Sequence, residues 1–292
     1  MTLSAAHHPD VVGFFDPTTH TVTYLVADPV TRAAAIIDPV LDYDPAAART
    51  STGSIDRVMD AVRDRGLKLE RVLETHAHAD HLTGADVIRT RTGAPIGIGE
   101  NIARVQKTFG ALFEAADVTP DAAAFDETYA DGARFMLGDL NVEVMHTPGH
   151  TPACVAYHIG DAVFVGDTMF MPDYGSARCD FPGGDARTLY RSIQKILALP
   201  AATRVFVGHD YLPKDGRTDF RWETTVGQEK IANIHIAGQS EDAFVAMREA
   251  RDATLPPPQL ILPALQLNIR AGALPPAETS GQRFLKLPLN AI

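Results

Sequence analysis

The chain has 292 residues, of which 45% are hydrophobic and 22% are charged, and its formal net charge at pH 7 is −11. This composition is typical of a globular protein with a sizeable core, and it excludes a disordered or fibrous chain. The acidic balance excludes broad binding to nucleic-acid backbones, which requires a basic face, so we expect no nucleic-acid partner.

The first third of the sequence predicts strands that lead into a histidine-rich turn. Three runs that alternate apolar and polar residues indicate an antiparallel meander; they are VVGFFD (11–16), HTVTYLVAD (20–28) and AAAIIDP (33–39). A helix with Ser54 as its N-cap and Gly66 at its end is expected next. The strand RVLETH (71–76) then enters the turn, and a helix that stops at Gly93 follows.

The middle of the chain repeats the strand pattern and then turns helical. Four apolar segments separated by Gly/Asp turns predict strands at 133–138, 141–147, 154–160 and 162–167. Gly183 to Asp185 open a helix that Pro200 stops, and the strand RVFVGHD (204–210) comes after it. Further helices are predicted at 224–236 and 241–252. This grouping indicates an α/β protein with two sheets packed face to face and helices outside.

The C-terminal segment is rich in proline. LPPPQLILPALQLNIRAGALPP contains too many prolines for a predicted helix and is too apolar for a free linker. We therefore expect residues 255–292 to form an extended arm packed on a single domain that comprises residues 1–292.

Cysteine usage and the absence of targeting signals point to the cytoplasm. Cys154 and Cys179 form no CxxC pair, so neither a disulfide framework nor a thiolate zinc site is predicted, and both thiols are expected to be buried packing groups. The first ten residues lack a basic region followed by an apolar stretch, and no apolar run reaches about 18 residues. We expect a soluble cytoplasmic protein with no membrane partner.

The strongest chemical signal is the segment Thr75-His-Ala-His-Ala-Asp-His81. It places His76, His78, Asp80 and His81 together at the end of an apolar strand, where alternation directs His76 and His78 to the same side. Imidazole and carboxylate groups are ligands that zinc and iron accept. The segment therefore predicts a metal site.

Three later strand ends carry a similar pattern, in which an apolar run meets a glycine and a candidate ligand follows at once. The ligands are His150 in TPGHT, Asp167 in VGDT and His209 in VGHDY. Glycine lets the backbone approach closely, and strand-end loops are where a rigid scaffold usually holds its chemistry. We expect these side chains to converge with the histidine-rich turn on one cleft.

The order of HxHxDH, a PGHT-type histidine, a GD aspartate and a GH histidine resembles the metallo-β-lactamase superfamily. The resemblance covers most of residues 12–212. It implies an αββα sandwich of two mixed β-sheets with metal at one edge, but that fold supports many reactions.

The resemblance leaves two catalytic alternatives for the metal ligands. In a dinuclear zinc hydrolase of glutathione thioesters, of the glyoxalase II type, His76, His78 and His150 would hold one Zn²⁺, Asp80, His81 and His209 a second, and Asp167 would bridge them. In a non-haem iron enzyme, His76, His150 and Asp167 would hold a single Fe(II), and His78, Asp80, His81 and His209 would surround it. A metal-binding protein without turnover is a third alternative.

Two segments outside the ligands resemble the persulfide dioxygenases, the iron branch of the superfamily. Gly175, Arg178, Asp180 and Phe181 match its GxxRxDF signature, and Asp210-Tyr211 follow His209 as in its HDY motif. The resemblance implies one Fe(II) per chain and oxidation of glutathione persulfide, or a similar small persulfide, by O₂ to sulfite and free thiol, in sulfide detoxification.

Within this branch the resemblance also suggests roles for neighbouring residues and partners. Arg178 would bind a substrate carboxylate and Tyr211 would contact the substrate, while Asp210 would orient a neighbouring group. We further expect a homodimer and a functional link to a sulfurtransferase.

Overall fold

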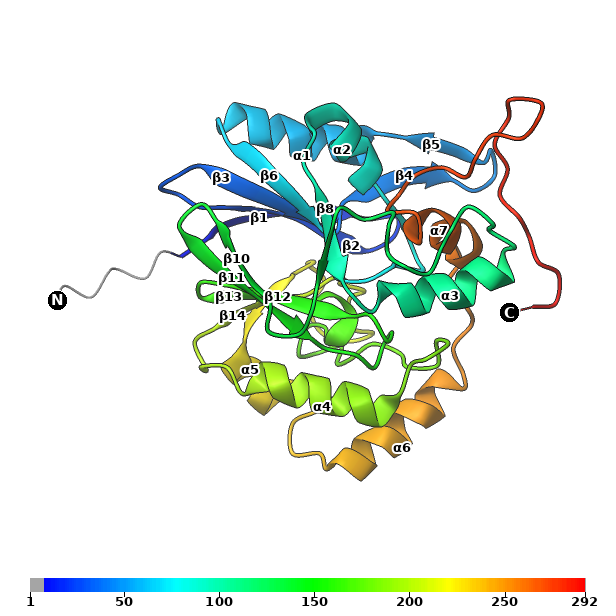
Figure 1. Ribbon diagram of the computed structural model, residues 1–292. Coiled ribbons are helices and arrows are strands. Elements are labelled where there is room, and N and C mark those ends of the chain that lie inside the picture. The colour runs from blue at the N-terminus through cyan, green and yellow to red at the C-terminus, as the bar shows by residue number, and fades with distance from the viewer. Residues whose placement is uncertain (1–7, 292) are drawn as a thin grey trace.

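The computed structural model describes residues 8–291; residues 1–7, where no leader sequence is expected, lie outside the described part. Two six-stranded sheets pack face to face, and helices cover their outer surfaces (Figure 1). The predicted α/β sandwich of two sheets with helices outside is therefore confirmed.

The first sheet is mixed. Its strands, in spatial order, are β1 (Asp10–Asp16), β2 (Thr21–Ala27), β3 (Ala33–Ile37), β6 (Lys68–Leu73), β8 (Ile96–Gly99) and β9 (Glu127–Tyr129). The first three strands form the predicted antiparallel meander, and β3, β6, β8 and β9 run parallel. A small sheet of β5 (Arg49–Ser51), β4 (Val40–Asp44) and β7 (Leu82–Thr83) lies beside it.

The second sheet is also mixed. Its strands are β10 (Arg134–Leu137), β11 (Leu140–His146), β12 (Val155–Ile159), β13 (Ala162–Phe164), β14 (Arg204–Phe206) and β15 (Glu223–Thr225). All neighbours are antiparallel except β13 and β14, which the helical crossover makes parallel. The crossover contains a short 3₁₀ turn, η1 (Gly166–Thr168), and α4 (Ala186–Leu197).

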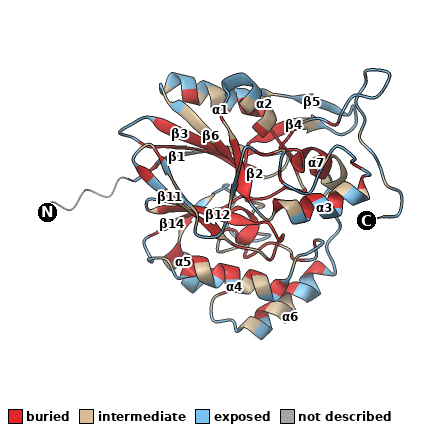
Figure 2. Cartoon of the chain, viewed as in Figure 1, coloured by how far each residue is buried: buried red, intermediate tan, exposed pale blue. Residues whose placement is uncertain are grey.

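The buried apolar side chains form three clusters, one between the two sheets and one between each sheet and its outer helices. Figure 2 shows the buried positions concentrated on the strands and on one side of the helices. Tyr24 and Val26 of β2 face the second sheet, whereas Leu25 faces the helices on the outside of the first. The outer helices of the first sheet are α1 (Gly53–Asp64), α2 (Ala85–Thr92), α3 (Ile102–Leu112) and α7 (Ile261–Asn268); those of the second are α4, α5 (Val226–Ala232) and α6 (Glu241–Asp252). This packing holds the strand ends rigidly.

Three local predictions are wrong. Helix α1 begins after Thr52, and the Ser54 hydroxyl instead donates to the Asp42 carboxylate at 2.6 Å. The predicted helix at 224–236 is shorter, because β15 occupies its first residues. The Pro-rich segment contains a buried helix, α7. Pro263 is the third residue of α7, where the backbone N–H has no partner within the helix and proline is tolerated.

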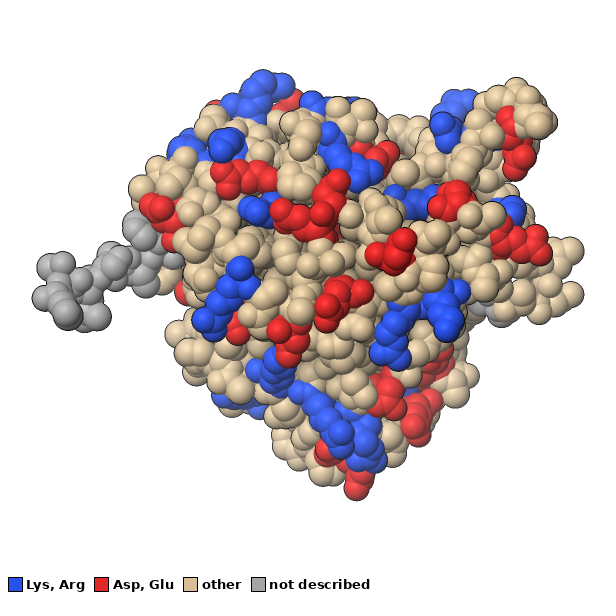
Figure 3. All heavy atoms as spheres, viewed as in Figure 1, with Lys and Arg blue, Asp and Glu red and all other residues tan. Residues whose placement is uncertain are grey.

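Charged side chains of both signs share the surface. Lysine and arginine side chains are interspersed with acidic ones on the face shown in Figure 3. No helix within residues 8–291 has the length and apolar character needed to cross a bilayer.

The assignment of residues 1–292 to one domain with an arm over 255–292 stays a prediction.

Candidate metal centre

Strand-end loops from both sheets bring the candidate ligands together. The turn after β6 supplies His76, His78, Asp80 and His81, the β11–β12 loop supplies His150, η1 supplies Asp167, and the end of β14 leads to His209. The imidazoles and Asp167 are buried, and Asp80 is partly exposed. Each sheet therefore contributes one part of the site.

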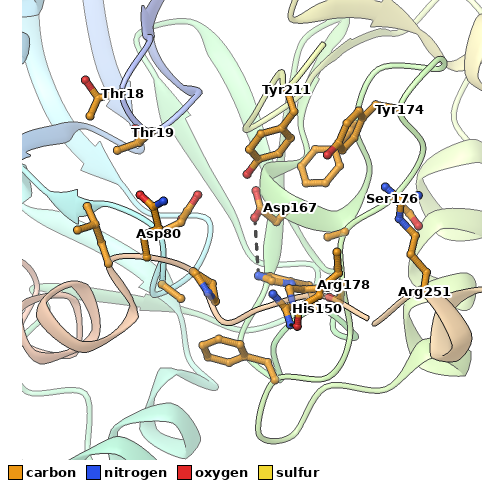
Figure 4. Close-up of a pocket in the computed structure, with 18 of the residues that line it drawn as sticks. Thr18, Thr19, Asp80, His150, Asp167, Tyr174, Ser176, Arg178, Tyr211 and Arg251 are labelled. Atoms are coloured by element: carbon orange, nitrogen blue, oxygen red, sulfur yellow. Dashed lines mark hydrogen bonds and ion pairs between the residues drawn. The ribbon is translucent and has the colours of Figure 1, made fainter. Parts of the chain in front are cut away.

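His76, His150 and Asp167 form the first group of side chains that could hold a metal ion. The Asp167 Oδ2 atom lies 3.9 Å from His76 Nε2 and 3.7 Å from His150 Nε2. Figure 4 shows His150 and Asp167 facing each other across this space. Two imidazoles and one carboxylate on one side of a cavity match the facial arrangement of non-haem iron sites.

His78, Asp80 and His209 form a second group next to the first. His209 Nε2 lies 3.2 Å from Asp80 Oδ2 and 3.3 Å from Asp167 Oδ1, so Asp167 directs one oxygen to each group. The His81 ring is 4.1 Å from that of His78, and its Nδ1 lies 3.2 Å from the Leu82 carbonyl. This leaves the buried Nε2 of His81 without a hydrogen-bond partner.

The electrostatics of the cluster fit a metal cation. Burial, together with the neighbouring imidazoles, lowers the pKa of His76 well below its usual value, so this ring is neutral and can donate a lone pair. Burial raises the pKa of Asp167 to about 8. Several inward-facing atoms, including His76 Nε2, Asp167 Oδ1 and His209 Nε2, have no hydrogen-bond partner within the described chain. Unpartnered buried ligand atoms are costly unless a cation satisfies them.

Buried carboxylates behind the histidine-rich turn orient one of its imidazoles, and they were not among the predicted site residues. His78 Nε2 lies 3.0 Å from Asp38 Oδ1 and 3.6 Å from Glu74 Oε2, which leaves Nδ1 of the ring for a metal. Asp38 also accepts hydrogen bonds from the Thr75 backbone and hydroxyl at 2.7 and 2.8 Å. Asp38 follows the apolar run of β3, so its position at a strand end was a signal that could have been used.

The backbone of the signature segment orients another ligand. His150 Nδ1 lies 2.7 Å from the Arg178 carbonyl oxygen, so Nδ1 must carry the proton and donate it. The lone pair of His150 is therefore on Nε2, the atom that faces Asp167.

Two members of the first group, His150 and Asp167, line a cavity of about 360 Å³. Asp80 and Tyr211 also line it (Figure 4), and so does Phe170. The Tyr211 ring stacks on His209 with a centroid distance of 5.3 Å. A small molecule in this cavity would lie against both the candidate ligands and an aromatic wall.

The region that contains the candidate ligands matches a known protein family. A family model described as the metallo-beta-lactamase superfamily matches residues 16–209, which contain every candidate ligand. The chain belongs to the metallo-β-lactamase superfamily.

Relatives within the superfamily have different names. The chain is 50% identical to a beta-lactamase hydrolase-like protein of Xylella fastidiosa over 99% of its own length, and it spans 66% of that relative. It is 31% identical to the mitochondrial persulfide dioxygenase ETHE1 of Homo sapiens, over 90% of this chain and 88% of that protein.

Among solved structures, ETHE1 from Myxococcus xanthus superimposes with a TM-score of 0.74 at 32% identity, covering 90% of this chain and 100% of the other. The expected resemblance to the persulfide dioxygenase branch of the superfamily is thus confirmed.

Arg178, Asp210 and the two cysteines are not candidate metal ligands, and their contacts show what each side chain does. The Arg178 guanidinium donates to both Asp180 oxygens at 2.6 Å and to the Pro256 carbonyl at 2.7 Å. Asp210 is buried and accepts from Arg217 at 2.5 and 2.6 Å. Both cysteines are buried, and neither lines the cavity.

A basic residue that sequence reasoning missed also lines the cavity. Arg251 of α6 is exposed, and its guanidinium makes no hydrogen bond or ion pair with residues 8–291. Figure 4 places it beside Ser176, on the side of the cavity away from Asp80. Arg251 lies on a helix beyond residues 16–209, which the family model matches, so no motif in the sequence pointed to it.

Proposed function

We propose that this protein is a non-haem Fe(II) dioxygenase that oxidises glutathione persulfide, or a similar small persulfide, in sulfide detoxification. With O₂ and water, the terminal sulfur of the persulfide leaves as sulfite and the carrier is released as the free thiol. One Fe(II) per chain would be held by His76, His150 and Asp167.

The observation that carries this proposal is that His150 and Asp167, two members of the three-residue ligand group with His76, line the cavity beside the GxxRxDF segment. Iron held there would supply adjacent open positions for the persulfide sulfur and O₂. The ETHE1 relatives support the same chemistry.

The chain's own residues would bind the substrate and exclude water. Burial, with the nearby Asp80 and Asp167 carboxylates, raises the pKa of Tyr211 well above its usual value, so its hydroxyl stays protonated. It can therefore donate a hydrogen bond to a bound anion, and Phe170 and Tyr174 pack against its ring at 5.7 and 5.2 Å. Asp210 and Arg217 would hold the loop that carries Tyr211.

The carboxylate of the thiol carrier requires a cation at the cavity. The resemblance to the persulfide dioxygenases implies this role for Arg178, and that role stays a prediction. The Arg178 guanidinium is already occupied by Asp180 and Pro256 and holds the cavity wall in place. We therefore propose that a carboxylate binds Arg251, which lines the same cavity and has no ion-pair partner within residues 8–291.

The test is O₂ consumption by Fe(II)-loaded protein given glutathione persulfide, with sulfite assayed in parallel. We expect uptake and sulfite to appear in step, and His150→Ala to abolish both while the fold is retained. His158→Ala, which changes a histidine of β12 outside the cavity, is the control and should remain active. Uptake retained in His150→Ala would exclude the proposed site.

A dinuclear zinc hydrolase of glutathione thioesters is the second candidate. The second group of ligands and the position of Asp167 between the two groups favour it, as does the name of the Xylella relative. Two bound metal ions per chain and thioester hydrolysis without O₂ uptake would favour the hydrolase. The cytoplasmic location, the homodimer and the link to a sulfurtransferase stay predictions.

A further inference from the structure

The turn that carries four of the seven candidate ligands has little support of its own. Residues 76–81 lie between β6 and β7 in neither helix nor strand. Within the described chain, none of them takes part in a backbone–backbone hydrogen bond. A turn that must hold imidazoles and a carboxylate in a fixed geometry therefore depends on side chains from elsewhere.

The side chain of Asn268 supplies that support. Its Nδ2 donates to the carbonyl oxygens of His78 and His81, each at 2.8 Å. Its Oδ1 accepts from the backbone N–H of Thr83 at 2.9 Å. Asn268 is only 2% exposed, so these bonds are shielded from water. Two donors and one acceptor on one short planar group are what an asparagine offers and what an aspartate or a leucine does not.

Asn268 is itself held in place. It is the last residue of α7, whose Leu265 and Leu267 are buried in the core under the first sheet. After the helix, Gly272 has a φ of +90°, and a Cβ there would lie 2.9 Å from the Thr83 carbonyl oxygen. Gln106 of α3 donates to the Ile269 carbonyl at 3.0 Å. The helix end is therefore anchored against the turn.

We propose that Asn268 is a positioning residue for the metal centre. By fixing the carbonyl groups of His78 and His81, it sets the path of the backbone that presents His76, His78 and Asp80 to the metal. The inference rests on the proposal that this turn binds metal, and it is independent of whether the reaction is oxidation or hydrolysis.

Loss of a group that orients metal ligands costs about 10–100-fold in metal affinity. We therefore expect Asn268→Asp and Asn268→Leu to weaken metal binding by about tenfold or more. Asn268→Asp keeps the shape and the acceptor but loses both donors, and it faces two carbonyl oxygens with a carboxylate.

The same helix provides a matched control. Gln266 is also 2% exposed, and its Nε2 donates to the carbonyls of Leu262 and Lys286, each at 2.9 Å. It therefore has a comparable buried amide, but its partners lie on α7 and the C-terminal segment rather than on the turn. Gln266→Leu should lower stability without altering metal binding.

The experiment titrates metal-free protein with Co²⁺ and records its affinity and its visible absorption, which reports ligand geometry, together with the Tm of each metal-free variant. The expected result is weaker binding and a changed spectrum for the Asn268 variants only. Parent-like affinity and spectrum in those variants would overturn the proposal, as would an equal loss in Gln266→Leu.

If neither Asn268 variant folds, Asn268→Ser, which retains one donor, is to be measured in the same way with the same criteria. Because the readouts are metal affinity and spectrum, they remain interpretable if the protein shows no O₂ uptake with any persulfide. The Asn268 result and the proposed function can therefore fail separately.

Discussion

Two arginines one turn apart on α6 differ in what surrounds their charges. Arg248 is 1% exposed and forms an ion pair with Asp252 at 2.6 Å, while its Nη1 donates to the Ser176 carbonyl. Arg251 has no such partner among the residues the structure describes, although it lines the same cavity. The first arginine thus fixes the cavity wall, and the second leaves a positive charge for a ligand.

Replacement of Arg251 by alanine is expected to weaken binding of carboxylate-bearing persulfides. A charge-assisted hydrogen bond contributes about 1.5–3 kcal/mol, so KM for glutathione persulfide should rise by about 10–100-fold with little change in kcat. Steady-state O₂ uptake measures both constants. Arg104→Ala, which changes an exposed arginine on α3 away from the cavity, should behave like the parent. With a persulfide that carries no carboxylate, Arg251→Ala should also behave like the parent. An unchanged KM in Arg251→Ala would refute this role.

Glu229 of α5 is a buried acid outside the metal centre. Its Oε2 accepts from Asn233 at 2.7 Å, but its Oε1 is buried without a partner. Burial, with a smaller effect of the Asp173 carboxylate, raises the pKa of Glu229 from 4.5 to about 8. Asn233 also donates to the Gly175 carbonyl, so this acid lies behind the loop that lines the cavity.

The raised pKa gives Glu229 a definite effect on stability. The folded state holds this proton more tightly than the unfolded state does. The free energy of unfolding therefore has its full value below pH 4.5 and decreases as the pH rises from 4.5 towards about 8. Glu229→Gln should remove this loss. We expect its metal-free Tm to exceed that of the parent clearly at pH 8.5, above the raised pKa, and to match it near pH 4.5. A constant Tm difference across this range would contradict the assignment.

At the scale of elements, helix α4 fixes the loop that carries His150. The Asp185 side chain caps α4 by accepting from the Thr188 N–H at 2.7 Å, and the Asp185 N–H donates to the Gly149 carbonyl at 2.9 Å. Gly149 has a φ of +135°, and a Cβ at this position would lie 2.4 Å from the backbone of Leu189. The helix and the loop approach each other this closely only because residue 149 is glycine.

Gly149→Ala is expected to displace the His150 loop from α4. The strained backbone costs about 1–3 kcal/mol, and the contact with Leu189 forces a shift that should also weaken metal binding. Gly132→Ala is the control, because Gly132 also has a positive φ, of +75°, but open space where its Cβ would lie. Thermal unfolding and metal titration should show lost stability in both variants but weakened metal binding only in Gly149→Ala. Equal metal affinity in the two variants would contradict this account.

The candidate ligands could be predicted from sequence because each one lies in the loop or turn that directly follows a strand, four of them after β6. The groups behind them could not, because they come from distant segments. Asn268 contacts the turn from α7, a helix that was not predicted because its segment is rich in proline. The sequence does not show that Pro263 falls in the first turn of a helix, where proline is tolerated. Arg178 matches a motif, but only the structure shows that Asp180 occupies its guanidinium.

At the scale of the whole molecule, the metal centre connects the two sheets. The first sheet leads to His76, His78 and Asp80, and the second leads to His150, Asp167 and His209. A cation bound to both sets would join the two halves of the sandwich at one edge. It would also satisfy buried atoms such as His76 Nε2 and Asp167 Oδ1, which have no hydrogen-bond partner among the residues the structure describes.

Metal binding should therefore stabilise the whole fold. At a metal concentration about 1,000 times Kd, linkage gives about 4 kcal/mol, which is roughly a 10 °C rise in Tm for a chain of this size. Calorimetry of metal-free protein with added Fe²⁺ under anaerobic conditions, or with Zn²⁺, measures this. The rise should shrink in His150→Ala. A Tm that does not respond to metal would show that these side chains do not bind it.

The hydrogen bonds of Asn268 also have a consequence for how the protein is made. Asn268 follows His78 by 190 residues and His81 by 187. During synthesis the histidine-rich turn leaves the ribosome long before the helix that holds it, and His150 and His209 also emerge first. If Asn268 positions the turn as proposed, tight metal binding would become possible only after α7 has emerged, and chains that end before α7 should compete poorly with finished protein for the cell's metal supply.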